Sequence, residues 1–347
     1  MLAVIKAVYQ NRMFRVRDGG RISEPHEQQF GICQGCPLSP FLFVMVMTVL
    51  MRDAKRQLLA SHLYVDPALF EIQELLYADD TLLVHGEPAA VEVYMSLVSR
   101  AGSEHGLSFN WGKLECMPVR CHAEFYTPGG DPVKTTQSMK YLGSMLSSDG
   151  KLGTELSYRL GQAKSEFNSL CKIWSHAAIP RKIKLRIFEA CVVSKLLYCL
   201  NIAWLHKGEI RKLDAFHHRC LRRIAGIQPS YWSRVSNADV LETLQCCPLS
   251  QILLEQQLRY IGHVARKPAG HPLRDIIFLP GSVSLRPVTG KRRKGRPRQT
   301  WARQLHTMSC EIGGGTENLE GLWENTKYAQ SRWDRAVEHY CQNLSKP

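Results

Sequence analysis

The chain has 347 residues, and its 45 Lys and Arg outnumber 31 Asp and Glu to give a formal net charge of +14. With 44% hydrophobic and 22% charged residues, it has the composition of a globular protein rather than of a disordered or fibrous one. The length allows two domains and a third small one. The positive surplus favours a polyanionic partner, nucleic acid before an anionic membrane, although a generally basic protein without such a partner has the same composition.

No export signal or membrane span is predicted. The apolar residues 2–5 are followed at once by Lys6, and the longest apolar run, 41–51, is shorter than the roughly 20 residues that cross a bilayer, so it is expected to be a buried helix. The twelve scattered cysteines favour free thiols and a nuclear or cytoplasmic, not secreted, protein. Two cysteines and two histidines allow either a distorted zinc site or buried thiols and surface imidazoles: Cys246, Cys247, His263 and His271.

The N-terminal part of the chain is expected to alternate between helices and hairpins. Residues 1–11 have the pattern of the end of a helix, and 12–29 that of a hairpin with an Asp-Gly-Gly turn at 18–20. A loop rich in Gly and Pro follows. Ser39 then provides a helix cap, and a helix is predicted from residue 41 to about residue 59.

Two more hairpins and one helix are predicted before residue 150. Two short apolar runs within 70–85 flank Ala78, Asp79 and Asp80, which predicts a hairpin with two carboxylates at its tip. Residues 88–105 have helical periodicity. A further hairpin is expected near 141–143, closed by the Asp-Gly at 149–150.

From residue 152 onward the pattern is helical. Residues 267–300 are rich in Pro, Gly and basic residues and are predicted to be linker. The expected helices are 152–175, 181–203, 209–225, 237–266 with a break near Pro248, 301–310 and 323–344. The predicted domains are 1–150, 151–235, and a C-terminal helical region 236–347 with a basic linker at 286–303.

Adjacent carboxylates at a hairpin tip can anchor a metal. Magnesium prefers oxygen ligands and often takes only one or two protein carboxylates together with substrate phosphates. Nucleotidyl transfer commonly uses two such ions, which activate the attacking hydroxyl and neutralise the leaving group. An Asp pair alone is weak support, because aspartate is common in solvated turns for its own hydrogen bonding.

Four sequence blocks resemble, in the right order, the motifs of reverse transcriptases. Residues 34–40 resemble Q-G-x-P-L-S-P, and 77–80 read Y-A-D-D. Residues 106–115 resemble G-L-x-x-N-x-x-K-x-E, and 141–143 resemble the hairpin that grips the primer end. The C-terminal half adds segments similar to those of non-LTR retrotransposon enzymes, at 216–224, 258–266 and 295–301. Retroviral enzymes lack that tail.

This resemblance implies an α+β fold: an incomplete polymerase palm with an antiparallel sheet (1–150), an all-α thumb (151–235), and a basic helical C-terminal region. It implies an RNA-directed DNA polymerase that uses two Mg²⁺ or Mn²⁺ ions. The partners would be an RNA template, a DNA primer and deoxynucleoside triphosphates, with no membrane partner. The oligomeric state stays open.

The resemblance also assigns roles to residues. Asp79 and Asp80 would bind metal, and Lys113 would assist catalysis near the leaving pyrophosphate, unless it is an ordinary surface lysine. Tyr141 and Leu142, with Gly143, would form the primer grip, with plain core packing as the alternative. The residues expected near the incoming nucleotide and template are Gln34, Gly35, Pro37, Tyr77 and Ala78.

Two basic stretches are candidates for contacts with the nucleic-acid backbone. The first is on the helix 209–225, and its contacts would be with phosphate and sugar, since A-like duplexes are recognised mainly by shape. The second, in the linker, fits a minor-groove or phosphate contact, a nuclear import signal, or a solvated linker. The candidate residues are Arg219, Arg222 and Arg223, then Lys291, Arg292, Arg293, Lys294, Arg296 and Arg298.

One departure from the family pattern concerns the metal site. Family members carry a further Asp on a strand before the helix with which this chain begins, and Asp18, in a surface turn, is no substitute. The expectation is an N-terminally truncated polymerase that is inactive, or nearly so, by itself. A non-catalytic nucleic-acid-binding remnant and a decayed gene product are the alternatives.

Overall fold

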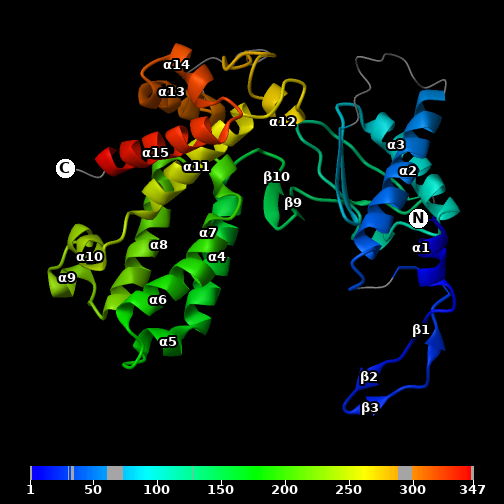
Figure 1. Ribbon diagram of the computed structural model, residues 1–347, viewed down its shortest axis with the longest axis horizontal. Coiled ribbons are helices and arrows are strands. Elements are labelled where there is room, and N and C mark those ends of the chain that lie inside the picture. Colours follow the sequence, from blue (N-terminus) through cyan, green and yellow to red (C-terminus); the bar gives the residue numbers. More distant parts are fainter. Residues whose placement is uncertain are drawn as a thin grey trace. The chain divides into compact units, whose positions relative to one another are not determined.

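The computed structural model describes residues 2–29, 31–32, 35–60, 73–127, 129–287 and 299–344. Contacts divide the chain into two compact units, Met1–Gln137 and Ser138–Pro347, coloured blue to cyan and green to red in Figure 1. Helices predominate and the sheets are small, which confirms the predicted α+β class. No helix in these ranges is long and apolar enough to cross a membrane.

The first unit begins with α1 (Leu2–Tyr9) and the predicted long hairpin. Its strands β1 (Met13–Phe14) and β4 (His26–Glu27) pair antiparallel, and β2 (Arg17–Asp18) pairs with β3 (Arg21–Ile22). The turn between β2 and β3 needs glycine, since Gly19 and Gly20 have φ of +51° and +83°.

Two helices and an antiparallel hairpin form the core of the first unit. Helix α2 (Ser39–Ala60) packs against α3 (Pro88–Glu104), and the hairpin of β5 (Gln73–Tyr77) and β6 (Asp80–Val84) lies between them in sequence. A 3₁₀ turn η1 (Trp111–Lys113) and the short strands β7 (Glu115–Cys116) and β8 (Lys134–Thr135) follow. The buried side chains come from α2 and α3: Leu50, Met51, Ala54, Leu58, Tyr94, Val98 and Ala101.

The second unit opens with a hairpin whose turn differs from the predicted one. Strands β9 (Ser138–Tyr141) and β10 (Ser144–Ser147) are joined by Leu142 and Gly143, with φ of +46° and +82°, which suits a two-residue hairpin loop. The prediction that Asp149 and Gly150 close this hairpin is wrong. Asp149 instead accepts hydrogen bonds from the Ser147 hydroxyl and the Lys151 amide, and these bonds lower the pKa of its carboxyl to about 2.

Helices build the rest of the second unit. In Figure 1, α4 and α7 run beside α8, and all three contribute to one core with α10 and the first half of α11. The helices, with one π-helical segment η2 and one 3₁₀ turn η3, are α4 (Gly153–Ser169), α5 (Cys171–Ser175), α6 (Arg181–Phe188), η2 (Glu189–Val193), α7 (Ser194–Leu197), η3 (Leu200–Ile202), α8 (Lys207–Ala225), α9 (Ser230–Ser233), α10 (Asn237–Leu244) and α11 (Leu249–Ala265).

A second core contains the other half of α11 and the C-terminal helices α13 (Trp301–Gly313), α14 (Thr316–Leu322) and α15 (Lys327–Leu344). The short helix α12 (Pro272–Asp275) follows α11 and contacts it. The linker predicted for 267–300 is wrong over its first part. Phe278 and Val283 are buried in this core, and the buried Arg274 donates hydrogen bonds to the Ala265 and Ser282 carbonyls. Residues 288–298 lie outside the described ranges.

Candidate functional site

The Asp pair lies at the tip of a tight hairpin, as predicted. Strands β5 and β6 pair so that Tyr77 faces Asp80, which leaves only Ala78 and Asp79 in the loop. Ala78 has a φ of +53°, a left-handed conformation that costs a non-glycine residue on the order of 1–2 kcal/mol. Asp79 and Asp80 are both exposed, so their carboxylates are open to a ligand.

Glu74 fixes this hairpin to both helices of the first unit. Its carboxylate accepts a hydrogen bond of 2.8 Å from the buried Tyr94 hydroxyl in α3 and forms an ion pair of 2.7 Å with Lys55 in α2. Burial, with the carboxylate as acceptor, raises the pKa of Tyr94. The side chain of Leu83 packs on the core from β6. Glu74 and Leu83 therefore anchor the hairpin to the core while the carboxylates at its tip face solvent.

The other predicted residues of the first unit are spread over its surface. Gly35, with φ of +85°, and Pro37 are exposed in the turn that precedes α2. Tyr77 is exposed beside the Asp pair. Lys113 is exposed at the end of η1, and among the ion pairs of the described residues it has none with either aspartate. Gln34 lies outside the described residues.

Within the described ranges, no group of three or more His, Cys, Asp or Glu side chains could hold a metal ion. This applies to the four Cys and His residues considered for zinc and to the hairpin tip alike. Asp79 and Asp80 fit a divalent ion in donor chemistry, because exposed carboxylate oxygens are ligands of Mg²⁺, and by themselves they would be two ligands of a larger set.

The predicted primer-grip hairpin is held by two side chains of α4 and by Tyr198, which directly follows α7. The Leu142 carbonyl accepts a hydrogen bond of 3.0 Å from the Tyr198 hydroxyl, and the Gly143 carbonyl accepts one of 2.5 Å from Arg159 Nη2. The amide of Met145 donates to Glu155 Oε2 at 2.5 Å. Three backbone groups of the hairpin are therefore bound to side chains of the helical core.

Arg159 and Glu155 form a buried ion pair within α4. Arg159 Nε lies 2.6 Å from Glu155 Oε1, and the two side chains are only 8% and 4% exposed. The guanidinium also lies 4.6 Å from the ring centre of Tyr198. Sequence reasoning missed both residues, since an i,i+4 pair of opposite charge is typical of an exposed helix face.

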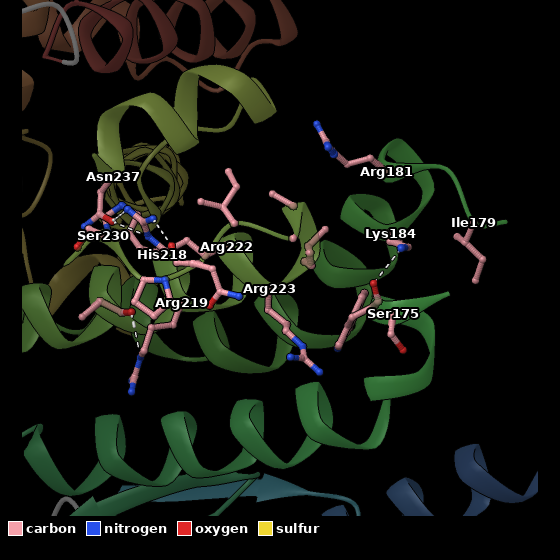
Figure 2. A pocket seen from close by; sticks show the side chains of 18 residues that line it. Ser175, Ile179, Arg181, Lys184, His218, Arg219, Arg222, Arg223, Ser230 and Asn237 are labelled. Carbon is pink, nitrogen blue, oxygen red and sulfur yellow. Dashed lines mark hydrogen bonds between the residues drawn. The ribbon is translucent and has the colours of Figure 1, made fainter. Parts of the chain in front are cut away.

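A basic cavity of about 1010 Å³ lies beside the C-terminal end of α8. Figure 2 shows its walls: α8 on one side, α5 and the start of α6 on the other, and the segment after α8 at its rim. Arg219 and Arg223 are exposed in it, as is Arg181 of α6. None of the described residues that line it is acidic.

Two of the cations in this cavity have structural roles. Arg222 is buried, and its guanidinium donates to the Gln228 and Val235 carbonyls at 3.0 and 2.8 Å and to Asn237 Oδ1 at 2.9 Å. Lys184 Nζ donates to the Trp174 carbonyl at 2.8 Å. Figure 2 shows the bonds of Arg222 to Asn237 and of Lys184 to Trp174 as dashed lines. The guanidinium of Arg222 is therefore used in hydrogen bonds within the fold. Of the three predicted phosphate-binding arginines of α8, only Arg219 and Arg223 are exposed to a ligand.

Two histidines of α8 are forced towards their neutral form. His217 is buried and stacks on Phe188 with ring centroids 5.8 Å apart. Burial lowers its pKa to about 4, and burial also lowers the pKa of His218, which lines the cavity. These histidines therefore add little positive charge to the basic cavity at neutral pH. The linker candidates Lys291, Arg292, Arg293, Lys294, Arg296 and Arg298 lie outside the described residues.

Comparison with known proteins supports the resemblance to reverse transcriptases in the N-terminal part of the chain. Residues 2–146 match the family described as reverse transcriptase (RNA-dependent DNA polymerase). The chain is also 24% identical over 241 residues to an uncharacterized transposon-derived protein of Caenorhabditis elegans, a match that covers 67% of this chain and 84% of that protein. With the acidic hairpin and the small sheets on helices, these findings support a reverse transcriptase-like protein.

Proposed function

We propose that this chain is the polymerase region of a reverse transcriptase of the non-LTR retrotransposon type. The observation that carries the proposal is the exposed Asp79–Asp80 pair on a hairpin fixed by Glu74, in a segment that matches the reverse transcriptase family. The non-LTR assignment rests on three sequence segments of the C-terminal half. Residues 216–224 lie in α8 and residues 258–265 in α11, and most of the third segment, 295–301, lies outside the described residues.

Asp79 and Asp80 would hold the divalent ions that reverse transcriptases use. Such ions stabilise negative charge on the attacking and leaving oxygens of a nucleotidyl transfer. The chain's own contribution is position: the two-residue turn holds the carboxylates at the edge of the sheet, beside the exposed Tyr77. The substrates would be an RNA template, a DNA primer and deoxynucleoside triphosphates.

We further propose that these 347 residues extend a primer poorly by themselves. A two-metal site needs more ligands than two adjacent carboxylates, and within the described ranges no third acidic side chain clusters with them. Lys113, exposed at the end of η1, is proposed as a cation for the leaving pyrophosphate. Its side chain would have to approach the bound substrate to act in this role.

The second candidate is a nucleic-acid-binding protein without chemistry. The basic cavity beside α8 favours it, because Arg181, Arg219 and Arg223 are exposed there and no acidic side chain balances them among the described lining residues. This function needs neither Asp79 nor a metal.

Primer extension on an RNA template with Mg²⁺ separates the two. The samples are this chain, its Asp79→Ala variant, and the chain extended at its N-terminus with the acidic strand of a non-LTR enzyme. Extension that the variant loses, in either the plain or the extended chain, supports the polymerase. If neither form extends a primer while both retain the oligonucleotide in a filter assay, the binding protein is correct and the polymerase proposal is wrong.

A further inference from the structure

Helix α9 presents two adjacent aromatic side chains to solvent. Tyr231 and Trp232 are 67% and 69% exposed, and their ring centroids lie 4.6 Å apart at an interplanar angle of 42°. Large aromatic side chains are usually buried for the apolar area they contribute, so an exposed contiguous pair indicates a surface that meets a partner.

The segment that carries this pair is held in a fixed shape. Arg222 binds the Gln228 carbonyl before α9 and the Val235 carbonyl after it, and so ties both ends of the segment to α8. Arg234 then reverses the chain with a φ of +57°, and Ser236 caps α10 by accepting the amide of Asp239 at 3.1 Å. A preformed platform loses little conformational entropy when a partner binds.

Positive charge continues from this platform along α8. The segment from Gln228 to Ser230 forms part of the rim of the basic cavity, and Tyr231 follows at once. A second cavity of about 550 Å³ shares Arg219 with the first and adds Lys164 and Lys212. The two cavities therefore form one basic surface, and the aromatic pair directly follows Ser230, which lines the first cavity.

We propose that this surface binds single-stranded nucleic acid, with a base stacked on Trp232 beside Tyr231 and phosphates along Arg219 and Arg223. A cationic groove with exposed aromatic rings is the general arrangement for unpaired strands, because only an unpaired base exposes its face for stacking. A duplex would use the cations alone. The surface lies in the second unit, and the inference does not require the Asp79 hairpin to be catalytic.

The test is binding of labelled 15-nucleotide RNA and DNA single strands to the whole chain, measured by fluorescence anisotropy. Loss of a stacked base costs about 1–3 kcal/mol, so Trp232→Ala should weaken binding about 5- to 150-fold. Trp232→Phe keeps an aromatic face and should retain most of the affinity. Tyr328→Ala is the matched control, since Tyr328 is 70% exposed in the same unit but lies on α15, and it should change nothing.

Two further arms separate stacking from charge. An abasic oligomer with the same number of phosphates should bind wild type and Trp232→Ala equally weakly. Arg223→Gln should reduce the slope of log affinity against log salt by about one, whereas Trp232→Ala should leave the slope unchanged.

The proposal is overturned if Trp232→Ala binds the single strands like Tyr328→Ala, or if the abasic oligomer binds wild type as tightly as the strand with bases. The RNA and DNA arms show which strand is preferred, and a preference for either supports the proposal. Failure of both the plain and the extended chain to extend a primer, with the expected single-strand binding, would sink the polymerase proposal and leave this inference standing, so the two proposals can fail separately.

Discussion

The buried Arg159–Glu155 pair should be the most sensitive ionic contact of the second unit. Replacing Arg159 with Met leaves Glu155 buried, with only the Met145 amide as donor, and leaves the Gly143 carbonyl without its guanidinium. Breaking a buried pair on one side costs about 3–5 kcal/mol, because an uncompensated charge stays in the interior. We therefore expect Arg159→Met to lower the free energy of unfolding by about 4 kcal/mol.

Urea unfolding followed by tryptophan fluorescence measures this effect, since six of the seven tryptophans lie in the second unit, all except Trp111. Lys195→Met is the matched control: its ion pair with Glu166 is largely exposed and should be worth at most about 1 kcal/mol. The double variant Arg159→Met with Glu155→Gln should recover at least half of the loss, because no bare charge remains buried. A loss for Arg159→Met no larger than for Lys195→Met would refute the reasoning.

Three other outcomes are expected. An alanine Cβ at Gly262 would lie 2.5 Å from Trp333 Nε1, so Gly262→Ala should lower the free energy of unfolding by about 1–3 kcal/mol. Gly161 lies on α4 with nothing near its Cβ position, so Gly161→Ala should raise the free energy of unfolding by up to about 1 kcal/mol. Equal melting temperatures of the two variants would contradict this. The neutral form of His217 is favoured in the folded state, where its pKa is about 4 against 6.5 unfolded, so stability is complete above pH 6.5 and falls as pH drops from 6.5 towards 4 by about 1.4 kcal/mol per unit. His217→Phe should flatten that part of a stability profile measured in urea at stepped pH, and an unchanged slope would exclude His217 as its source. Tyr94→Phe removes a hydrogen bond to the Glu74 carboxylate and should destabilise the first unit by about 1.5–3 kcal/mol. The change is measured by Trp111 fluorescence in a chain whose other tryptophans are replaced by Phe. Tyr126→Phe is the control, because its bond to Glu124 is exposed and its loss should cost well under 1 kcal/mol.

Local chemistry was enough to predict the acidic hairpin. Two short apolar runs on both sides of a short polar turn leave few structures other than two paired strands, and the structure has β5 and β6 where this pattern is. The break of the helical pattern at Pro248 also predicted the separate helices α10 and α11.

Long-range contacts set what the sequence could not predict. Arg222 differs from Arg219 and Arg223 because the segment from Gln228 to Asn237 folds back and provides acceptors for its guanidinium. Residues 267–287 have the composition of a linker, yet Phe278 and Val283 find a core formed by α11, α13 and α14. The hairpin turn at Leu142 was missed because leucine rarely adopts a positive φ, and it is stabilised here by Tyr198, 56 residues away.

Helix α11 contributes to both cores of the second unit, with Leu249 and Leu253 in one and Leu258 and Ile261 in the other. At the middle of the helix, the buried Gln257 amide donates to the Leu200 and Ala203 carbonyls, and Trp333 Nε1 donates to the Leu258 carbonyl. Because both cores share α11, unfolding of either core disrupts the other. The two cores should therefore unfold in a single cooperative transition. A fragment that stops at residue 235 would lose Val240, Leu249 and Leu253 from the first core, so an expression boundary for the helical half belongs after α15 and not between α9 and α10.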